Sequence, residues 1–513
     1  MTAMVNLFEL VTAAPGGGEE RLLLADHPLR PFAAADPDRS NARVLNRVLD
    51  APAWGGDLYA DPARMTGTIS AGSLKLSNAD GALSYLAGHS WISLIWRRGS
   101  PGAAFGDWQT VAVARPQPPQ WAVSSADPAT LTITLYDLRD DLADEVQTNL
   151  LAGDAVGNVG LGGPPDLKDR PVPLALGDLA SGNVTPPLAN QGRQIWRLAD
   201  PAAGAIATIY NVYYRGGDAG LSDLGDLGAG LEAASLTAGQ RARDMTRCLL
   251  RAGGNVSGEL TVDLAGPAAA GTTAPSIIQW LLQRRYGSGV ALGPGFAAGL
   301  STAAVGLWLD EAASYRDLID RLCRSAGLWC APDATGVWQL GRYDPPAAPL
   351  ASIGVNDIVQ LEGDEVDPPA WSVAVKWGRN YTPLGRGSIA EAVIGTAREA
   401  WLAQEWRTET ASDVGVKARY LNARKVEVET DLRGQADAAA LAGRLLGLLS
   451  LRSDGSPRRG YRVAVPMDKW RGYPLGSTLR LAWPAEGIDE PLLLVGQRYC
   501  SPEPHLMWAR LWG

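Results

Sequence analysis

Residues 310–343 constrain the fold most, because they predict a capped amphipathic helix that runs directly into a β-hairpin. Ser314 and Asp317 have the Ser-x-x-Asp spacing of an N-terminal capping box, and apolar residues then recur at helical spacing. Gly327 follows at the position where a glycine in the left-handed conformation commonly ends a helix. Strands at 328–332 and 337–342 flank a turn. The unit lacks the cluster of His, Cys and carboxylate that chemistry needs, so we expect a chain built for assembly rather than catalysis.

The 513 residues are enough for several domains, and the patterning predicts an α+β, mostly β, multi-domain fold. Composition and turn signals place the boundaries at four ranges. These are a β-rich domain at 1–145, a Pro/Gly-rich β insertion domain at 146–267, an α+β helix–hairpin domain at 268–345, and a domain with two helices at 346–513.

Alternation and turn residues predict the individual elements. We expect strands at 67–76, 90–96, 109–115, 130–136, 205–214, 256–264, 371–377, 426–430, 461–466, 477–483, 491–500 and 508–512. We expect helices at 140–150, 275–286, 398–406 and 436–451, and a turn at 78–81. The prolines between 164 and 187 argue against a central strand there and favour extended or edge segments.

The charge balance argues against binding to nucleic acid. The formal net charge is −9, and the 46 Lys and Arg residues are scattered in runs no longer than pairs or triplets. The N-terminal residues have no basic region typical of a signal peptide, and no window is long and apolar enough for a membrane span. We therefore expect synthesis and folding in a cytoplasm.

The four cysteines are Cys248, Cys323, Cys330 and Cys500, and they form no C-x-x-C motif. Buried free thiols are the default interpretation. A metal or an iron–sulfur cluster is the open alternative.

Candidate catalytic groups are few. The chain has three histidines, and only Asp26-His27 offers a local carboxylate–imidazole pair, which Pro28 marks as a surface turn. Gly-rich stretches at 16–18 and 160–163 lack the Gly-Lys-Ser/Thr end of a phosphate loop. Asp140-Asp141 could belong to a glycosidase, but with Arg139 and Glu145 they fit a solvated helix face. We name no catalytic, cofactor-binding or metal-binding residue.

Three stretches, taken in order, resemble one family. The segment 163–173, GPPDLKDRPVP, followed by Asn183-Val184-Thr185-Pro186, is similar to a G-x-x-x-L-K-x-x-P-x-P … N-V-x-P signature. The helix–hairpin at 314–342 and the closing pattern from 436 to 513 complete the series. Together they resemble the hub, or upper-baseplate, tail proteins of long-tailed bacteriophages, prophages and gene transfer agents.

The resemblance implies that the first and last domains are barrel-like, tube-type domains. It implies a homotrimeric ring at the distal end of the tail tube that joins a sixfold tube to a threefold tip and passes DNA during ejection, without specific DNA binding. The implied partners are distal tail and tail tube proteins, central spike or fibre proteins and the tape measure protein. The implied locations are the virion tail and, during assembly, the host cytoplasm.

The rival interpretation is a carbohydrate- or receptor-binding tail adhesin. Trp outnumbers Phe by 18 to 4, and exposed Trp faces stack on sugars. Several long helices suit that class less well.

Overall fold

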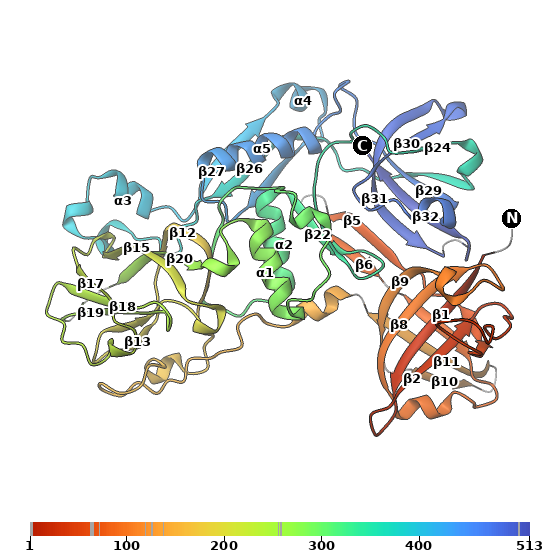
Figure 1. Ribbon diagram of the computed structural model, residues 1–513. Coiled ribbons are helices and arrows are strands. Elements are labelled where there is room, and N and C mark those ends of the chain that lie inside the picture. The colour runs from red at the N-terminus through yellow and green to blue at the C-terminus, as the bar shows by residue number, and fades with distance from the viewer. Residues whose placement is uncertain are drawn as a thin grey trace.

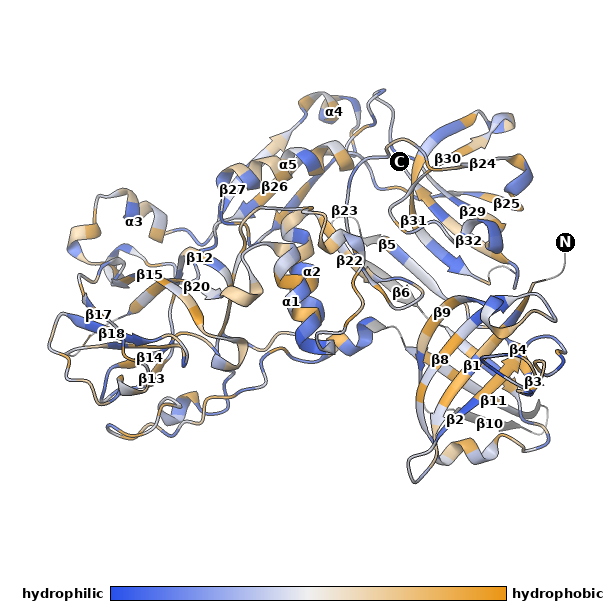
Figure 2. Cartoon of the chain, in the orientation of Figure 1, coloured by the Kyte–Doolittle hydropathy of each residue, from blue (hydrophilic) through white to orange (hydrophobic). Residues whose placement is uncertain are grey.

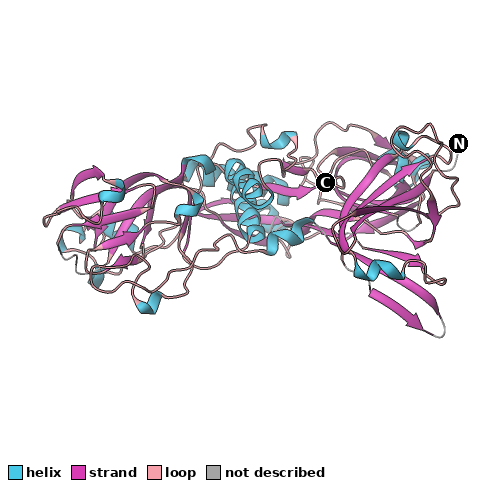
Figure 3. Ribbon diagram, turned by 60° about the horizontal axis from the view of Figure 1, so that its bottom comes forward, coloured by secondary structure: helices cyan, strands magenta, loops and turns pink. Residues whose placement is uncertain are grey.

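The computed structural model describes residues 4–61, 66–70, 72–117, 120–124, 127–136, 138–254, 256, 259–500 and 503–513. The molecule is elongated, with strand-rich regions at both ends and the longer helices between them (Figure 1, Figure 3). Strands hold 40% of the residues and helices 20%, so the predicted mostly β, multi-domain fold is confirmed. No helix in the described part of the chain is long and apolar enough to cross a membrane.

The N-terminal region is a nine-stranded, nearly closed barrel-like sheet. Its strand order is β3-β2-β1-β8-β9-β11-β7-β4, with β10 paired to β11, and a single residue links β3 to β4 at the two ends. Apolar residues dominate β1 and β8 (Figure 2). The strands are β1 (Val5–Ala13), β2 (Glu19–Ala25), β3 (Val44–Asn46), β4 (Val48–Asp50), β7 (Ser73–Ser77), β8 (Ser90–Gly99), β9 (Gln109–Pro116), β10 (Gln120–Ser124) and β11 (Asp127–Tyr136).

The C-terminal region is an eight-stranded sheet that recruits two strands from the start of the chain. Its order is β24-β30-β31-β32-β29-β25, and β5 pairs with β31 and carries β6. The long strand β31 pairs with β30 along its first half and with β5 near its end. The strands are β5 (Gly55–Asp61), β6 (Thr66–Ser70), β24 (Ser352–Ile353), β25 (Gln360–Asp364), β29 (Gly460–Pro466), β30 (Thr478–Trp483), β31 (Ile488–Tyr499) and β32 (Leu506–Trp512).

One apolar core joins these two sheets. It contains Phe8 and Trp96 from the first sheet and Leu494 and Leu511 from the second. Tyr499 lies against Trp96 and also against Trp54, whose ring centroid is 5.0 Å away. Because close-packed interiors transmit strain, this shared core couples the N-terminal barrel-like sheet to the C-terminal sheet.

Polar contacts reinforce this junction at its edge. Arg98 Nε lies 2.7 Å from the Asp468 carboxylate, and Arg98 also donates to the Pro504 carbonyl. The Val113 N–H donates to the Ala334 carbonyl, at the tip of the central hairpin. Three parts of the chain that are far apart in sequence therefore meet here.

The central region packs helices against a second large core. α1, α2 and the β22–β23 hairpin lie beside a three-stranded sheet of order β27-β26-β28, which α5 covers. The elements are α1 (Ala274–Tyr286), α2 (Tyr315–Ala326), β22 (Leu328–Pro332), β23 (Trp338–Arg342), β26 (Ala370–Trp377), α3 (Ala397–Leu402), β27 (Arg407–Ser412), α4 (Val414–Arg419), β28 (Arg424–Glu429), α5 (Gln435–Leu449) and α6 (Met467–Trp470).

Two five-stranded sheets form the far end of the molecule (Figure 1). Their orders are β16-β15-β20-β12-β21 and β13-β14-β19-β18-β17. The strands are β12 (Leu174–Val184), β13 (Leu188–Asn190), β14 (Ile195–Arg197), β15 (Ile206–Tyr214), β16 (Gly217–Asp218), β17 (Ser222–Asp226), β18 (Gln240–Asp244), β19 (Leu249–Ala252), β20 (Leu260–Pro267) and β21 (Gly306–Leu309).

The predicted helix–hairpin unit is confirmed. The Ser314 hydroxyl oxygen accepts from the Asp317 N–H at 3.0 Å and caps α2. Asp317 departs from a full capping box, because its carboxylate accepts from the Ser314 hydroxyl. Gly327 closes the helix at φ 63°, the left-handed conformation that favours glycine.

Two predictions near the first sheet are wrong. The single strand expected at 67–76 is two strands in different sheets, β6 and β7, with residue 71 outside the described part. The helix expected at 140–150 is only a 3₁₀ turn at Leu138–Ala143, after which Glu145 and Leu150 form isolated bridges with Ser314 and Pro171. Both differences arise from pairing with segments elsewhere in the chain, which the local sequence pattern does not indicate.

Three further predictions need correction. The prolines between 164 and 187 predict edge strands, but β12 begins directly after Pro173 and pairs on both sides, with β20 and β21. It can do so because β12 itself contains no proline, so all of its backbone N–H groups remain available for hydrogen bonds. The helix expected at 398–406 ends at Leu402, since the chain turns into β27. The strand expected at 256–264 is β20, which starts at Leu260; residues 257 and 258 lie outside the described part.

The domain boundaries at 145, 267 and 345 stay a prediction. Two pairings run across them: β5 joins the C-terminal sheet, and β21 joins β12.

Candidate functional site

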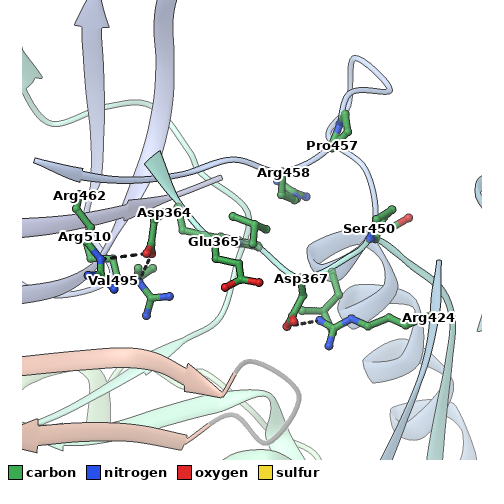
Figure 4. Close-up of a pocket in the computed structure, with 14 residues that line it drawn as sticks. Asp364, Glu365, Asp367, Arg424, Ser450, Pro457, Arg458, Arg462, Val495 and Arg510 are labelled. Carbon is green, nitrogen blue, oxygen red and sulfur yellow. Dashed lines mark hydrogen bonds and ion pairs between the residues drawn. The ribbon is translucent and has the colours of Figure 1, made fainter. Parts of the chain in front are cut away.

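A charged groove crosses the outward face of the C-terminal sheet. Two adjoining pockets, of about 320 and 360 Å³, form it and share Arg462 and Arg510 in their walls. Figure 4 shows the side chains that line the first of these pockets, from β25 across to the end of α5.

Strand register builds a row of facing side chains along this groove. Arg462 of β29 is the direct partner of Glu362 in β25 and of Arg510 in β32. Gly496 of β31 then lies between Arg510 and Asp57 of β5. Because residues on directly opposed strand positions share one face, these five positions form a row across five strands.

Gly496 is the gap in this row. A Cβ atom at Gly496 would lie 3.0 Å from the Arg510 Cβ, which is tighter than ordinary contact. The missing side chain lets Arg510 reach across β31. A register shift between Leu494 and Gly496 marks a bulge at the same point.

Arg510 clamps two strands that come from opposite parts of the chain. Its Nη1 lies 2.7 Å from Asp57 Oδ2, and its Nε pairs with Asp364, which also pairs with Arg462 at 3.0 Å. Burial disfavours the guanidinium charge, but the two carboxylates outweigh it and raise the pKa of Arg510. The arrangement holds β5 and β25 against the closing strand.

The other end of the groove is also closed by ion pairs. Arg424 Nη2 lies 3.0 Å from the Asp367 carboxylate, as Figure 4 shows. The Arg458 guanidinium lies over the Trp512 ring at 5.2 Å. The walls of these two pockets contain carboxylates and guanidiniums but neither His nor Cys. The groove thus has the chemistry of a structural clamp and lacks a nucleophile–base pair.

The chain is similar over its whole length to solved tail proteins, whereas no protein-family model and no curated protein matches it. The tail protein from Neisseria meningitidis MC58 shares 11% identity at a TM-score of 0.42, covering 99% of this chain and 96% of that one. A prophage MuSo2 tail protein from Shewanella oneidensis shares 9% at 0.40, with coverages of 99% and 96%. A prophage tail protein from Listeria monocytogenes EGD-e shares 9% at 0.38, with coverages of 98% and 94%.

Within the described structure, Asp26 does not hold His27 as a carboxylate–imidazole pair. His27 is exposed, and the Asp26 carboxylate accepts from the Asn6 backbone and side chain instead. His89 Nδ1 lies 3.1 Å from the Thr12 hydroxyl. His89 Nδ1 also lies 3.7 Å from the Glu20 carboxylate, so the same ring nitrogen faces a hydroxyl and a carboxylate. His505 is exposed beside Glu503, 3.5 Å away.

The acidic pair at 140–141 lies on a 3₁₀ turn and not on the predicted helix; Asp140 is exposed, as expected of a solvated face, whereas Asp141 is half-buried. Arg139 is almost fully buried and lies 2.7 Å from the Asp320 carboxylate in α2. Asp140 pairs with Arg316, and Asp141 pairs with Arg115. These contacts fasten the 3₁₀ turn to the central helices.

The cysteines are separate free thiols. Cys248, Cys323 and Cys330 are buried, and Cys500 is half-buried. Burial raises the pKa of Cys248 to about 11 and that of Cys330 to about 12. Within the described ranges, no three His, Cys, Asp or Glu side chains form a group that could hold a metal ion.

Sequence reasoning missed the Arg510 clamp. Trp508, Arg510 and Trp512 alternate along the closing strand, which indicates one outward face. The partners Asp57 and Asp364 have no local signal, since they meet Arg510 only through long-range strand pairing.

Proposed function

We propose that this protein is a structural tail protein of phage type, the baseplate hub at the distal end of a tail tube. The observation that carries the proposal is that one chain contains a nearly closed barrel-like sheet and a second large sheet, joined through one core. The three sequence stretches that resemble hub proteins support it independently.

The assembly that this arrangement favours is a ring of three subunits. Three copies with two barrel-like units each present six such units around an axis, which matches a sixfold tube. The same ring keeps threefold symmetry for a spike or fibre below. A head-to-tail contact repeated by rotation closes such a ring.

The ring would contact distal tail and tail tube proteins above and central spike or fibre proteins below, with the tape measure protein in the lumen before ejection. DNA would pass through without specific binding. The net charge of −9 supports this passage. A negatively charged wall displaces no counterions from the DNA phosphates, so it gains no binding free energy from their release. The protein would reside in the virion tail, after assembly in the host cytoplasm.

We assign the chain no catalytic activity and no cofactor. The carboxylates of the outward groove are held by arginines, an arrangement that suits mechanical coupling of strands. The four ranges 1–145, 146–267, 268–345 and 346–513 are proposed as its domains, with β5 as the link between the first and the last.

The test is the position of the protein in particles. Particles made with an epitope-tagged chain should bind gold-labelled antibody at the distal tail end, and lysates without the chain should contain heads that lack functional tails. Label along the tail shaft, or normal tails without the chain, would contradict the proposal. Label on side fibres would favour an adhesin.

A further inference from the structure

Two surface segments of opposite charge stand out on this acidic chain. Residues 414–425 contain four basic residues and no acidic one. Residues 217–232 contain four acidic residues and no basic one. The first segment surrounds α4, and the second surrounds β17. Figure 1 shows α4 and β17 on different parts of the molecule, so the two segments do not face each other within one chain.

The basic segment has cations without carboxylate partners. Lys417 and Lys425 both lie over the Trp371 ring, at 4.6 and 5.2 Å, and Arg419 donates to the Gly455 carbonyl. Among the described residues no carboxylate pairs with these three. Both ammonium groups are thus held by the same ring, and their positive charges are available to an external carboxylate.

Apolar side chains stand beside these cations. Leu421 is 102% exposed and Val414 is 73% exposed. Exposed apolar side chains surrounded by unpaired charges are typical of protein–protein contacts. In such contacts the apolar side chain is buried on binding and polar groups surround it.

The acidic segment has matching features. The Asp218 and Asp226 carboxylates accept only from the backbone N–H groups of Gly220 and Gly228 within the described structure. Leu224 and Leu227 are exposed at 44% and 36%. β17 is also the edge strand of its sheet, paired only with β18.

Arg424 of the first segment and Asp223 and Glu232 of the second already form ion pairs within the chain. The charges left for a contact are therefore the cations of Lys417, Arg419 and Lys425 on one segment and the carboxylates of Asp218 and Asp226 on the other, and both segments also have exposed apolar side chains.

We infer that the α4 segment of one copy docks on the β17 segment of the next copy. The inference rests on the proposed ring, and it names the surfaces that close it. Two different patches of one chain meet, so the contact is heterologous and generates a ring when the rotation closes. Opposed charge patterns also fix the orientation and speed the encounter of subunits.

Charge reversal tests the contact. Lys417→Glu/Lys425→Glu should weaken self-association, measured by mass photometry across dilutions, by more than about tenfold, since like charges then face each other. Asp218→Lys/Asp226→Lys should weaken it similarly, and the combined variant should restore it. Arg30→Glu/Arg170→Glu, an equal charge change at exposed positions elsewhere, should leave it unchanged.

A cysteine pair gives a test that does not depend on charge. In a Cys500→Ser background, Leu421→Cys protein mixed with Leu224→Cys protein should be joined by a short bis-maleimide, whereas either protein alone should not. Both side chains are exposed, so these changes leave the fold intact. Cross-linking of Leu421→Cys alone would mean a twofold contact and would overturn the inference.

The two proposals fail differently. A wild-type chain that stays monomeric at every concentration would refute the ring and this contact together. A trimer that survives both charge reversals would leave the ring standing and refute only the contact between α4 and β17.

Discussion

At the residue scale, Glu9 shows how charge is used inside the N-terminal sheet. Its side chain is fully buried in β1 and is approached by Arg21 at 3.2 Å, by Arg97 at 3.5 Å and by Arg39. Arg39 and Arg97 also lie over the Phe105 ring. Glu9 therefore fastens the loop that contains Arg39 to the outside of the barrel-like sheet.

Glu9→Gln should destabilise this region at neutral pH. Burial opposes ionisation, but the hydrogen bonds and charges of Arg39, Arg21 and Arg97 outweigh it and lower the pKa of Glu9 below 4.5. A lowered folded pKa contributes stability above the unfolded value, and this is lost as pH falls through the folded value. We expect a loss of about 3 kcal/mol at pH 7 that shrinks below pH 4.5. Hydrogen exchange of the β1 amides in the wild type and the variant, at pH 7 and below pH 4.5, measures this loss of stability. An equal loss at the two pH values would contradict the prediction.

Arg510→Met should loosen β5. The change leaves the Asp57 and Asp364 carboxylates without their shared cation, at a cost of about 1 kcal/mol for a partly exposed network. Exchange of β5 amides should rise several-fold. Arg480→Met removes an exposed pair with Asp489 in the same sheet and serves as the control. Equal exchange in both variants would show that Arg510 is not a clamp.

At the element scale, β32 closes the C-terminal sheet and pairs on both sides, with β29 and β31. Ala509 and Leu511 face the shared core, and Gly513 exchanges two backbone hydrogen bonds with Arg459. β32 therefore cannot leave the sheet without exposing two strand edges.

Deleting Trp508–Gly513 should block ring formation and leave heads without functional tails. Burial of Trp512 alone is worth several kcal/mol, from roughly 150–250 Å² at about 25 cal/mol per Å². Electron microscopy of lysates and a count of infectious particles measure the effect, and Trp512→Phe should retain assembly. Normal infectious particles from the deletion would show that β32 is dispensable.

Local elements were predictable and long-range pairings were not. α2 and its hairpin follow from Ser314, Gly327 and alternating residues, all within one short segment. The split of 67–76 depends on non-adjacent strands, since β6 pairs with β5 whereas β7 pairs with β4 and β11. The place of β5 in the C-terminal sheet depends on β31, which is hundreds of residues away. The Arg510 clamp was unpredictable for the same reason.

At the scale of the whole molecule, the acidic charge is what we expect of the passive DNA conduit proposed above. Purified protein should not retard linear double-stranded DNA in a gel at physiological salt, because a net charge of −9 releases no counterions from DNA. Retardation that fades with rising salt would contradict a lumen without DNA affinity. Binding lost in Lys417→Glu/Lys425→Glu would assign it to the basic segment.

The central claim is that three copies close a ring, and electron microscopy of the purified full-length chain tests it most directly. The account predicts particles with threefold symmetry and a central hole, in which each subunit contributes two barrel-like units. Compact single-chain particles without a hole, at every concentration tested, would contradict it.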